Sequence, residues 1–179
     1  MEGQLLIAHP LLNDGFFNRS VIYVTNHNVE GSFGFTLNFK TELKLGDLRP
    51  QIKNGNFPVF DGGPVAKDQL FFLHTLGKDV NESFHIKDNI YFGGDINDIL
   101  HLIEHGKVKQ SDIRFFIGYS GWGANQLEKE IKSNSWLLND HQSNDLFLIN
   151  HSELWKQKLE EINANYGIFS DIGFDPSMN

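Results

Sequence analysis

The chain has 179 residues and a formal net charge of −8, and 40% of its residues are hydrophobic and 21% charged. This length is sufficient for one domain to bury a core, and the composition is typical of a folded globular protein rather than a disordered one. The absence of cysteine excludes thiol catalysis, thiolate metal sites and disulfide bonds. We therefore expect one domain spanning residues 1–179.

The N-terminal segment has no targeting pattern. No basic region precedes its first apolar run, and His9 and Pro10 interrupt that run, so it does not resemble a signal peptide. No apolar stretch approaches the roughly 18 residues that a membrane-spanning helix needs. We expect a cytoplasmic protein that makes no contact with a membrane.

The distribution of positive charge argues against direct DNA binding. Arginine, the best bidentate reader of phosphate and guanine, occurs only at positions 19, 49 and 114. The nearest approach to a basic cluster is formed by Lys107, Lys109 and Arg114. Together with the acidic net charge, this pattern predicts no binding of nucleic acid at physiological salt.

The first half of the chain is predicted to consist of β-strands. Apolar or alternating runs predict the strands, and a five-residue connector at 27–31 that ends in glycine predicts a hairpin. One helical turn is expected near 45–48, within a more polar segment. The predicted strands lie at 3–9, 20–26, 32–38, 57–65, 69–76, 83–86 and 89–94, and the last two are expected to form a hairpin.

The second half of the chain contains the predicted helices. Asp95 is a predicted N-cap for a helix that starts at 96, carries apolar residues at helical spacing and stops at Gly106. Asn150 and Glu153 resemble a capping pair for the last helix. The two further helices are expected at 124–134 and 151–162.

The remaining segments complete the predicted fold. Further strands are expected at 112–119, 136–139 and 145–150, and the aromatic tail at 166–179 is expected to dock on the body. Many strands followed by helices favour an α+β fold with a mixed sheet.

A serine lies in the glycine-rich part of residues 114–131, RFFIGYSGWGANQLEKEI, between a predicted strand and a predicted helix. In α/β-hydrolases this context places the nucleophile, with glycines two residues before and two residues after the serine. Gly118 fits that pattern before Ser120, but Trp122 occupies the position after it. The tryptophan would obstruct the close approach of strand and helix that the hydrolase turn requires.

The chain beyond Ser120 offers weak support for a catalytic triad. Asp140 or Asp145 followed by His151 satisfies the order of acid and histidine, but only 59 residues follow the serine. That is short for the rest of a hydrolase sheet. We interpret 118–123 as a tight turn from strand to helix that serves packing, with no catalytic residue.

The histidines give no convincing metal site. His101 and His105 match the His-x-x-Glu-His pattern of one zinc-protease class, but helical spacing places them opposite the apolar face of their helix. We expect them to point to solvent without holding a metal. His27 and His74 stand singly and are interpreted as hydrogen-bonded structural histidines.

The stretch DGGPV at 61–65 predicts a rigid corner. Proline fixes φ, and the two glycines allow dihedral angles that other residues avoid. The stretch lacks the Lys and Ser/Thr of a phosphate-binding loop. It indicates structure rather than chemistry.

Seven motifs, in their order along the chain, are similar to those of the bacterial AlgH/YqgE family. They extend from about Gly3 to Trp155 and are GQLLIAHPLL, FNRSVIYVTNHNVEGSFGFTLN, PVFDGGPV, LFFLH, GYSGWGANQLEKEI, SWLL and ELW. The resemblance implies a compact α+β fold with a mixed, partly barrel-like β-sheet flanked by about three helices. Members are described as transcriptional regulators, although no biochemical activity is established for the family.

The resemblance also bears on single residues. Many members have alanine where this chain has Ser120, which implies that the position does not need a hydroxyl. Asn125 stands where members usually have glycine before Gln-Leu-Glu. The YFGGD segment at 91–95 differs from the segment of proteobacterial members, which is richer in Ser and Thr.

We therefore expect a non-catalytic, AlgH-like regulator that acts through a protein or small-molecule partner, without metal or cofactor. The sequence specifies no oligomeric state. Polar residues at turns beside packed strands suggest a binding groove between the glycine turns and the helix at 124–134, although the same groups would serve equally to brace those turns. The residues expected there are Asn38, Asp61, Gly62, Gly63, His74, Gly121, Gln126 and Glu130. The alternatives are a serine hydrolase using Ser120 and a regulator that binds DNA directly.

Overall fold

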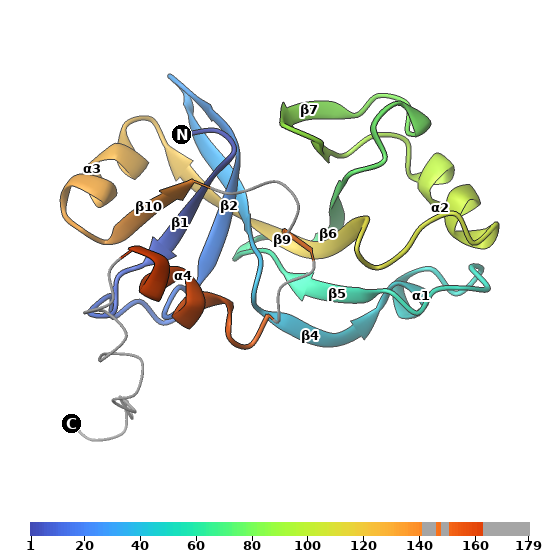
Figure 1. Cartoon of the computed structure of the whole chain (residues 1–179), viewed down its shortest axis with the longest axis horizontal. Helices are drawn as coiled ribbons and strands as arrows, with labels where there is room; N and C mark the ends of the chain where they lie inside the picture. Colours follow the sequence, from blue (N-terminus) through green and yellow to red (C-terminus); the bar gives the residue numbers. More distant parts are fainter. Residues whose placement is uncertain (141–145, 148–150, 163–179) are drawn as a thin grey trace.

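The computed structural model describes residues 1–140, 146–147 and 151–162, and Figure 1 shows their arrangement. In this part of the chain, ten strands form one curved sheet and four α-helices accompany it. The predicted α+β fold with a mixed, partly barrel-like sheet is confirmed. Of the helices, α1 is a single turn, so three longer ones remain. No helix of the described residues is both long and apolar enough to cross a membrane.

The elements follow the chain in this order. The strands are β1 Gln4–Ala8, β2 Val21–Asn28, β3 Gly31–Thr36, β4 Lys40–Lys44, β5 Pro58–Asp61, β6 Val65–His74, β7 Phe84–Lys87, β8 Ile90–Phe92, β9 Ile113–Gly123 and β10 Trp136–Asp140. The α-helices are α1 Leu45–Leu48, α2 Ile96–Glu104, α3 Gln126–Lys132 and α4 Leu154–Ile162, and a short 3₁₀ turn spans Gly77–Asp79.

Strand β9 joins the two halves of the sheet. The strand order is β10-β1-β2-β3-β9-β6-β8-β7, and β4 pairs with β5, which in turn pairs with β9. The β5–β9 pair is parallel, whereas β3 and β6 pair with β9 in antiparallel fashion, so the sheet is mixed. Figure 1 shows β9 in the middle of the molecule, with β1, β2, β10, α3 and α4 on one side and β4 to β8, α1 and α2 on the other.

Two hydrophobic clusters lie on the two faces of this central strand. Phe116 belongs to the cluster that contains Tyr23 and Phe35, whereas its neighbour Phe115 belongs to the cluster that contains Ile99. Successive side chains of a strand point to opposite faces of a sheet, so a pair of adjacent phenylalanines supplies both clusters.

The predicted turn at 118–123 is wrong, because β9 continues to Gly123. Ser120 pairs with Gly34, and Trp122 pairs with Ser32, so the serine lies inside a strand. The chain turns only afterwards, at Asn125, which adopts the left-handed conformation with φ 59°. That conformation favours glycine, which is why a glycine there is compatible with the same turn. The glycines of the motif allow close strand packing rather than a sharp reversal.

Other expectations near the N-terminal half are confirmed with shifted boundaries. The β2–β3 hairpin forms, but Val29 and Glu30 alone connect its strands instead of five residues. The helical turn at 45–48 and the hairpin of β7 and β8 are present. Strand β4 was not expected, because its residues are half-exposed and show no apolar run.

The helical expectations are also largely confirmed. Asp95 caps α2 by accepting a hydrogen bond from the amide of Asn97 at 2.8 Å, and Gly106 follows the helix with φ 67°. Helix α4 begins at Leu154, three residues later than expected, after a turn. The predicted cap Asn150, most of the strand at 145–150 and the tail at 166–179 lie outside the described residues.

Candidate functional site

The DGGPV corner crosses β9 at very close range. It carries the chain from β5, which pairs with β9 in parallel, to β6, which pairs with β9 in antiparallel fashion. A Cβ on Gly62 would lie 2.4 Å from the carbonyl oxygen of Gly118, and one on Gly63 would lie 2.1 Å from the carbonyl carbon of Tyr119. Only glycine permits such an approach of two backbones. The corner is rigid because its backbone is in direct contact with the backbone of β9.

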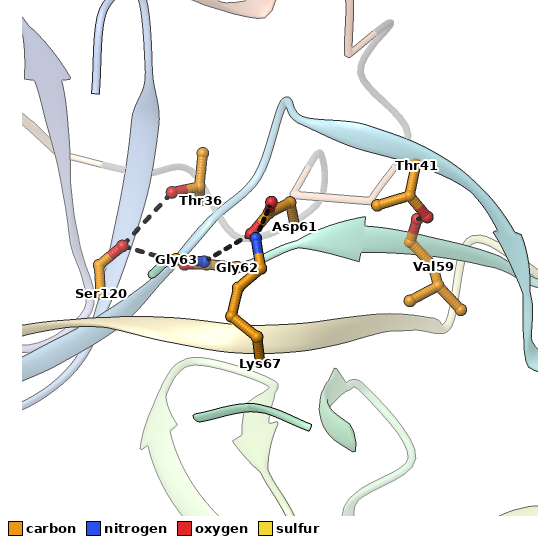
Figure 2. Close-up of polar contacts among 8 residues, drawn as sticks. All are labelled: Thr36, Thr41, Val59, Asp61, Gly62, Gly63, Lys67 and Ser120. Atoms are coloured by element: carbon orange, nitrogen blue, oxygen red, sulfur yellow. Dashed lines mark hydrogen bonds and ion pairs between the residues drawn. The ribbon is translucent and has the colours of Figure 1, made fainter. Parts of the chain in front are cut away.

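Asp61 holds this corner in shape, as Figure 2 shows. One carboxylate oxygen accepts a hydrogen bond from the amide of Gly63 at 3.2 Å, and the other forms an ion pair with Lys67. The carboxylate therefore has structural partners on both oxygens. The strands that lead into the corner are also linked by a side chain. The hydroxyl of Thr41 in β4 donates a hydrogen bond to the carbonyl oxygen of Val59 in β5 at 2.8 Å (Figure 2).

Ser120 lies on the far side of the same crossing. Its side chain is completely buried, and its hydroxyl donates to the carbonyl oxygen of Gly62 at 3.0 Å. The hydroxyl of Thr36 lies 3.4 Å away (Figure 2). Neither partner is a base that could remove the serine proton, and the hydroxyl has no route to a substrate. Ser120 therefore stabilises the crossing of the glycine corner over β9.

The acid and histidine considered for a triad lie elsewhere. Asp140 ends β10 on the surface, where it accepts a hydrogen bond from Gln4. His151 contacts the ring of Phe60 edge-on, with 5.6 Å between ring centroids. Asp145 lies outside the described residues. The structure gives a nucleophilic Ser120 no support.

Gln126 and Glu130 form a small network with two tryptophans. One carboxylate oxygen of Glu130 accepts from the indole nitrogens of Trp122 at 2.8 Å and Trp136 at 2.7 Å. The other oxygen accepts from the side-chain amide of Gln126 at 2.9 Å. Gln126 in turn accepts from the amide of Gly123 at 3.0 Å. These contacts fix α3 against β9 and β10, which is a structural role.

His74 is fully buried and is a hydrogen-bonded structural histidine, as predicted. Its Nε2 lies 3.0 Å from the carbonyl oxygen of Gly93 and 3.1 Å from the hydroxyl of Ser83, while its Nδ1 accepts from the amide of Leu76 at 3.2 Å. The Gly93 contact places the proton on Nε2 and leaves Nδ1 as the acceptor. Burial lowers the pKa of this imidazole below its ordinary value of 6.5.

Asn38 links the segment after β3 to the segment that leads into β2 through hydrogen bonds that do not involve the glycine corner. Its side chain accepts from the amide of Val21 at 2.8 Å and donates to the carbonyl of Arg19 at 2.9 Å. The eight residues expected to share one groove are thus divided among several places, and most have structural partners there. A ligand-binding role for them stays a prediction.

Of those eight residues, Gly121 lines a groove with aromatic walls, about 590 Å³ in volume. It lies where β3, β6, β8 and β9 meet. Its wall residues are Phe33, Phe35, Val65, Phe71, Phe92, Tyr119 and Trp122, and its rim carries Asn26, Asn28, Glu30 and Ser32. The sequence predicted the strands but not this groove, because the contributing side chains come from four separate segments. The alternation of phenylalanines in 32–38 was its one local signal.

Gly121 lines the groove, and its backbone is expected to contribute polar groups there. In antiparallel pairing, the N–H and C=O of alternate residues point to opposite edges of a strand. The amide of Gly123 donates to Gln126 rather than to β3, so Gly121, two residues earlier, also directs its amide and carbonyl away from β3. Strand β6 begins at Val65 opposite Tyr119 and does not extend to this position. We therefore expect the amide and the carbonyl of Gly121 to lie beside the apolar wall as one donor and one acceptor.

The histidine pair at the C-terminal end of α2 points to solvent, as predicted. His101 and His105 are both exposed, with ring centroids 4.1 Å apart. No group of three metal-ligating side chains gathers anywhere in the part of the chain that the structure describes. A catalytic zinc site needs three protein ligands and an open position.

Comparison with known proteins agrees with this fold. A UPF0301 protein of Cytophaga hutchinsonii is 39% identical, with 99% of this chain and 98% of that protein covered. A UPF0301 protein of Bacteroides thetaiotaomicron is 36% identical, with coverage of 99% and 91%.

Two solved structures share the fold. The solution structure of the AlgH protein from Pseudomonas aeruginosa aligns with a TM-score of 0.74 at 26% identity, covering 94% of this chain and 92% of that one. The crystal structure of a Corynebacterium diphtheriae protein aligns with a TM-score of 0.76 at 18% identity, covering 94% and 91%, which supports the fold alone. A family model described as AlgH-like matches residues 5–167. The chain therefore belongs to the AlgH-like family.

Proposed function

We propose that this protein is a non-catalytic, cytoplasmic regulator that binds a small, largely apolar ligand in the aromatic groove and does not read DNA directly. The observation that carries the proposal is the groove, with a volume of about 590 Å³ and aromatic walls. Small-molecule sites typically have volumes of about 300–1,000 Å³, apolar walls and a few fixed polar groups. Val65 on the wall is 39% exposed and Gly121 is exposed, so the groove is accessible.

The wall chemistry specifies the kind of ligand. The rings of Phe33 and Tyr119 are 5.9 Å apart, and those of Phe33 and Phe92 are 5.5 Å apart, each pair in edge-to-face contact. Such rings favour offset stacking or edge contacts with another flat ring. Beside them, Gly121 presents its backbone donor and acceptor. We expect a planar ring compound with a donor and an acceptor on one edge.

The position of the positive charges supports a role without direct DNA contact. Arg114, which the sequence grouped with Lys107 and Lys109, is only 6% exposed and turns into the protein. Of the three residues of this predicted basic cluster, only Lys107 and Lys109 are therefore exposed. A duplex-binding face needs several cations that neutralise phosphates together.

A neutral dye tests the groove directly. We expect Nile red to bind the full chain saturably, with a blue-shifted emission and quenching of tryptophan fluorescence through Trp122. Gly121→Val should weaken binding at least tenfold, because its side chain would occupy the groove. A Cβ at Gly121 would meet the ring edge of Tyr119 at 3.2 Å and the Val65 side chain at 4.0 Å, and no backbone atom, so the fold should survive.

A matched pair of surface variants serves as the control. Val65→Gln alters the groove wall and should weaken binding, whereas Leu11→Gln changes a 73% exposed leucine that does not line the groove. Native mass spectrometry after incubation with a metabolite extract should show a small molecule retained by the wild type and lost in Gly121→Val. Equal dye binding by all four proteins contradicts the proposal. So does salt-dependent binding of a labelled duplex at physiological salt.

A further inference from the structure

Arg114 is a buried cation with an unusual set of partners. Its guanidinium donates to the carbonyl oxygens of Leu37 at 2.8 Å and Phe147 at 3.1 Å. Its carbon centre lies 4.3 Å from the centroid of the Phe60 ring. Among the described residues, no carboxylate forms an ion pair with it. Within the described residues, its charge is therefore solvated by neutral dipoles and by aromatic faces.

Residues 1–140, 146–147 and 151–162 supply no ion-pair partner for this positive charge. Removing an ion from water costs several kcal/mol unless an opposite charge is nearby. Burial lowers the pKa of Arg114 to about 10, so it stays protonated at neutral pH. A guanidinium also keeps five N–H groups, of which the two carbonyls use two. The described residues provide no hydrogen-bond partner for the remaining N–H groups, so these donors could bind an anion.

A cavity of about 290 Å³ opens beside Arg114. Lys40 and His151 line it as well, and the described residues around it include no Asp or Glu. Phe60 brings the three groups together, because Lys40 pairs with it across β4 and β5 and His151 contacts its ring. The cavity is thus positive within a protein whose net charge is −8.

A second cavity adjoins this one, which we call the inner cavity because the buried Arg114 lines it. The second cavity has a volume of about 540 Å³ and shares Lys40 and His151 with the inner cavity, and both Lys44 and Glu42 lie along it. A ligand with its anionic group at Arg114 would have space for the rest of its structure here. No lining residue is shared with the aromatic groove.

We propose that the inner cavity binds the phosphate group of a small phosphorylated molecule, held by Arg114, Lys40 and His151. Two permanent positive charges match a phosphate dianion better than a singly charged carboxylate. A guanidinium fork suits phosphate oxygens, and lysine adds a mobile point charge. Burial and the charges of Lys40 and Arg114 lower the pKa of His151, so its ring is a neutral hydrogen-bond partner near pH 7.

Inorganic phosphate is the probe for the test. The full chain is titrated with phosphate at pH 7.5 and low ionic strength by isothermal calorimetry, with acetate in a parallel titration. We expect saturable phosphate binding and acetate binding at least tenfold weaker. In a pH titration by NMR, phosphate should raise the pKa of the His151 ring, because the bound anion stabilises the imidazolium.

Variants at exposed lysines separate the site from general charge. Lys40→Gln should weaken phosphate binding at least fivefold, whereas Lys132→Gln, on α3, removes the same charge and should leave it unchanged. Arg114→Lys should weaken it further, and if that variant fails to fold, the exposed Lys40 decides. The proposal is overturned by the absence of saturable phosphate binding, by equal effects of Lys40→Gln and Lys132→Gln, or by acetate binding as tight as phosphate.

Discussion

The hydroxyl of Ser120 donates a hydrogen bond to the carbonyl oxygen of Gly62, 58 residues earlier in the chain, at 3.0 Å. The same carbonyl accepts the amide of Thr36 at 3.0 Å. One oxygen thus joins the glycine corner to two strands at the point where the chain crosses β9. Ser120, which in sequence resembles a hydrolase nucleophile, therefore stabilises the central crossing of the fold.

Ser120→Ala should therefore cost about 1–3 kcal/mol of unfolding free energy. The carbonyl of Gly62 keeps its bond from the amide of Thr36, but the buried hydroxyl of Thr36 loses its Ser120 partner. Urea unfolding of both proteins measures the difference. A fluorophosphonate probe should label neither protein, and labelling of the wild type that disappears in Ser120→Ala would restore the hydrolase hypothesis.

Two glycines with positive φ should respond very differently to alanine. At Gly63 a Cβ would lie 2.1 Å from the backbone of Tyr119, whereas at Gly106 nothing lies within 4 Å of it. Gly106→Ala should cost about 1–2 kcal/mol, the penalty of a left-handed alanine alone. Gly63→Ala should cost more than about 4 kcal/mol and abolish folding at 37 °C, because two backbones must separate.

Circular dichroism and thermal melts of the two alanine variants make this comparison. Similar melting temperatures for both would mean that the crossing can open without loss of structure. That result would contradict our interpretation that the DGGPV corner is in fixed contact with β9.

The sequence predicted most elements of this fold because their signals are local. Asp95 predicts the start of α2 because its own side chain caps the helix, and the alternation of apolar residues around Phe35 predicts β3. The turn at 118–123 was misplaced because glycine permits both turns and close strand packing. The choice between them depends on Gly62 and Gly63, which are distant in sequence.

Glu130→Ala should destabilise the protein by about 2–3 kcal/mol, because two buried indole N–H groups lose a charged acceptor. Glu130→Gln keeps one acceptor oxygen and should cost about half as much. Glu128→Ala, on the same helix, removes an exposed carboxylate that lies 3.6 Å from His27 and should cost less than about 1 kcal/mol.

Tryptophan fluorescence during urea unfolding reports on this network directly, since Trp122 and Trp136 donate to Glu130. We expect a changed native emission maximum for Glu130→Ala and an unchanged one for Glu128→Ala. If the two variants lose equal stability, the network is not what fixes α3.

Asn125 offers a test of backbone conformation without packing effects, because it is exposed and has φ 59°. Asn125→Gly should be neutral or stabilise by up to about 1 kcal/mol, since glycine adopts this conformation freely. Asn125→Ala should destabilise by about 1 kcal/mol, because alanine does not. Urea unfolding of the three proteins gives the order Gly, Asn, Ala, and alanine as the most stable residue would contradict it.

The candidate sites were harder to predict than the fold. The polar motif residues Asp61 and Glu130 looked available in sequence, but each has a partner from another element that only the folded chain supplies. Arg114 showed the reverse, since it read as part of a surface cluster and is buried beside Phe60. Grooves and cavities are assembled from several segments, so no single motif carries them.

His74 should make the stability of the protein depend on pH. Its pKa is lowered in the folded state, so between the folded value and 6.5 the unfolded chain binds a proton that the native chain resists. Its stabilising contribution is complete above pH 6.5 and is lost as the pH falls toward the folded value. Protonation would also convert Nδ1 from the acceptor of the Leu76 amide into a donor.

Unfolding free energies at pH 7.5, 6.5 and 5.5 should therefore fall with decreasing pH in the wild type and fall less in His74→Asn. His101→Asn is the matched control, because it makes the same substitution at an exposed histidine on α2. His151 also has a lowered pKa and contributes in the same direction, so His151→Asn is measured alongside. If His74→Asn retains the full wild-type slope, the buried imidazole is not the group that titrates.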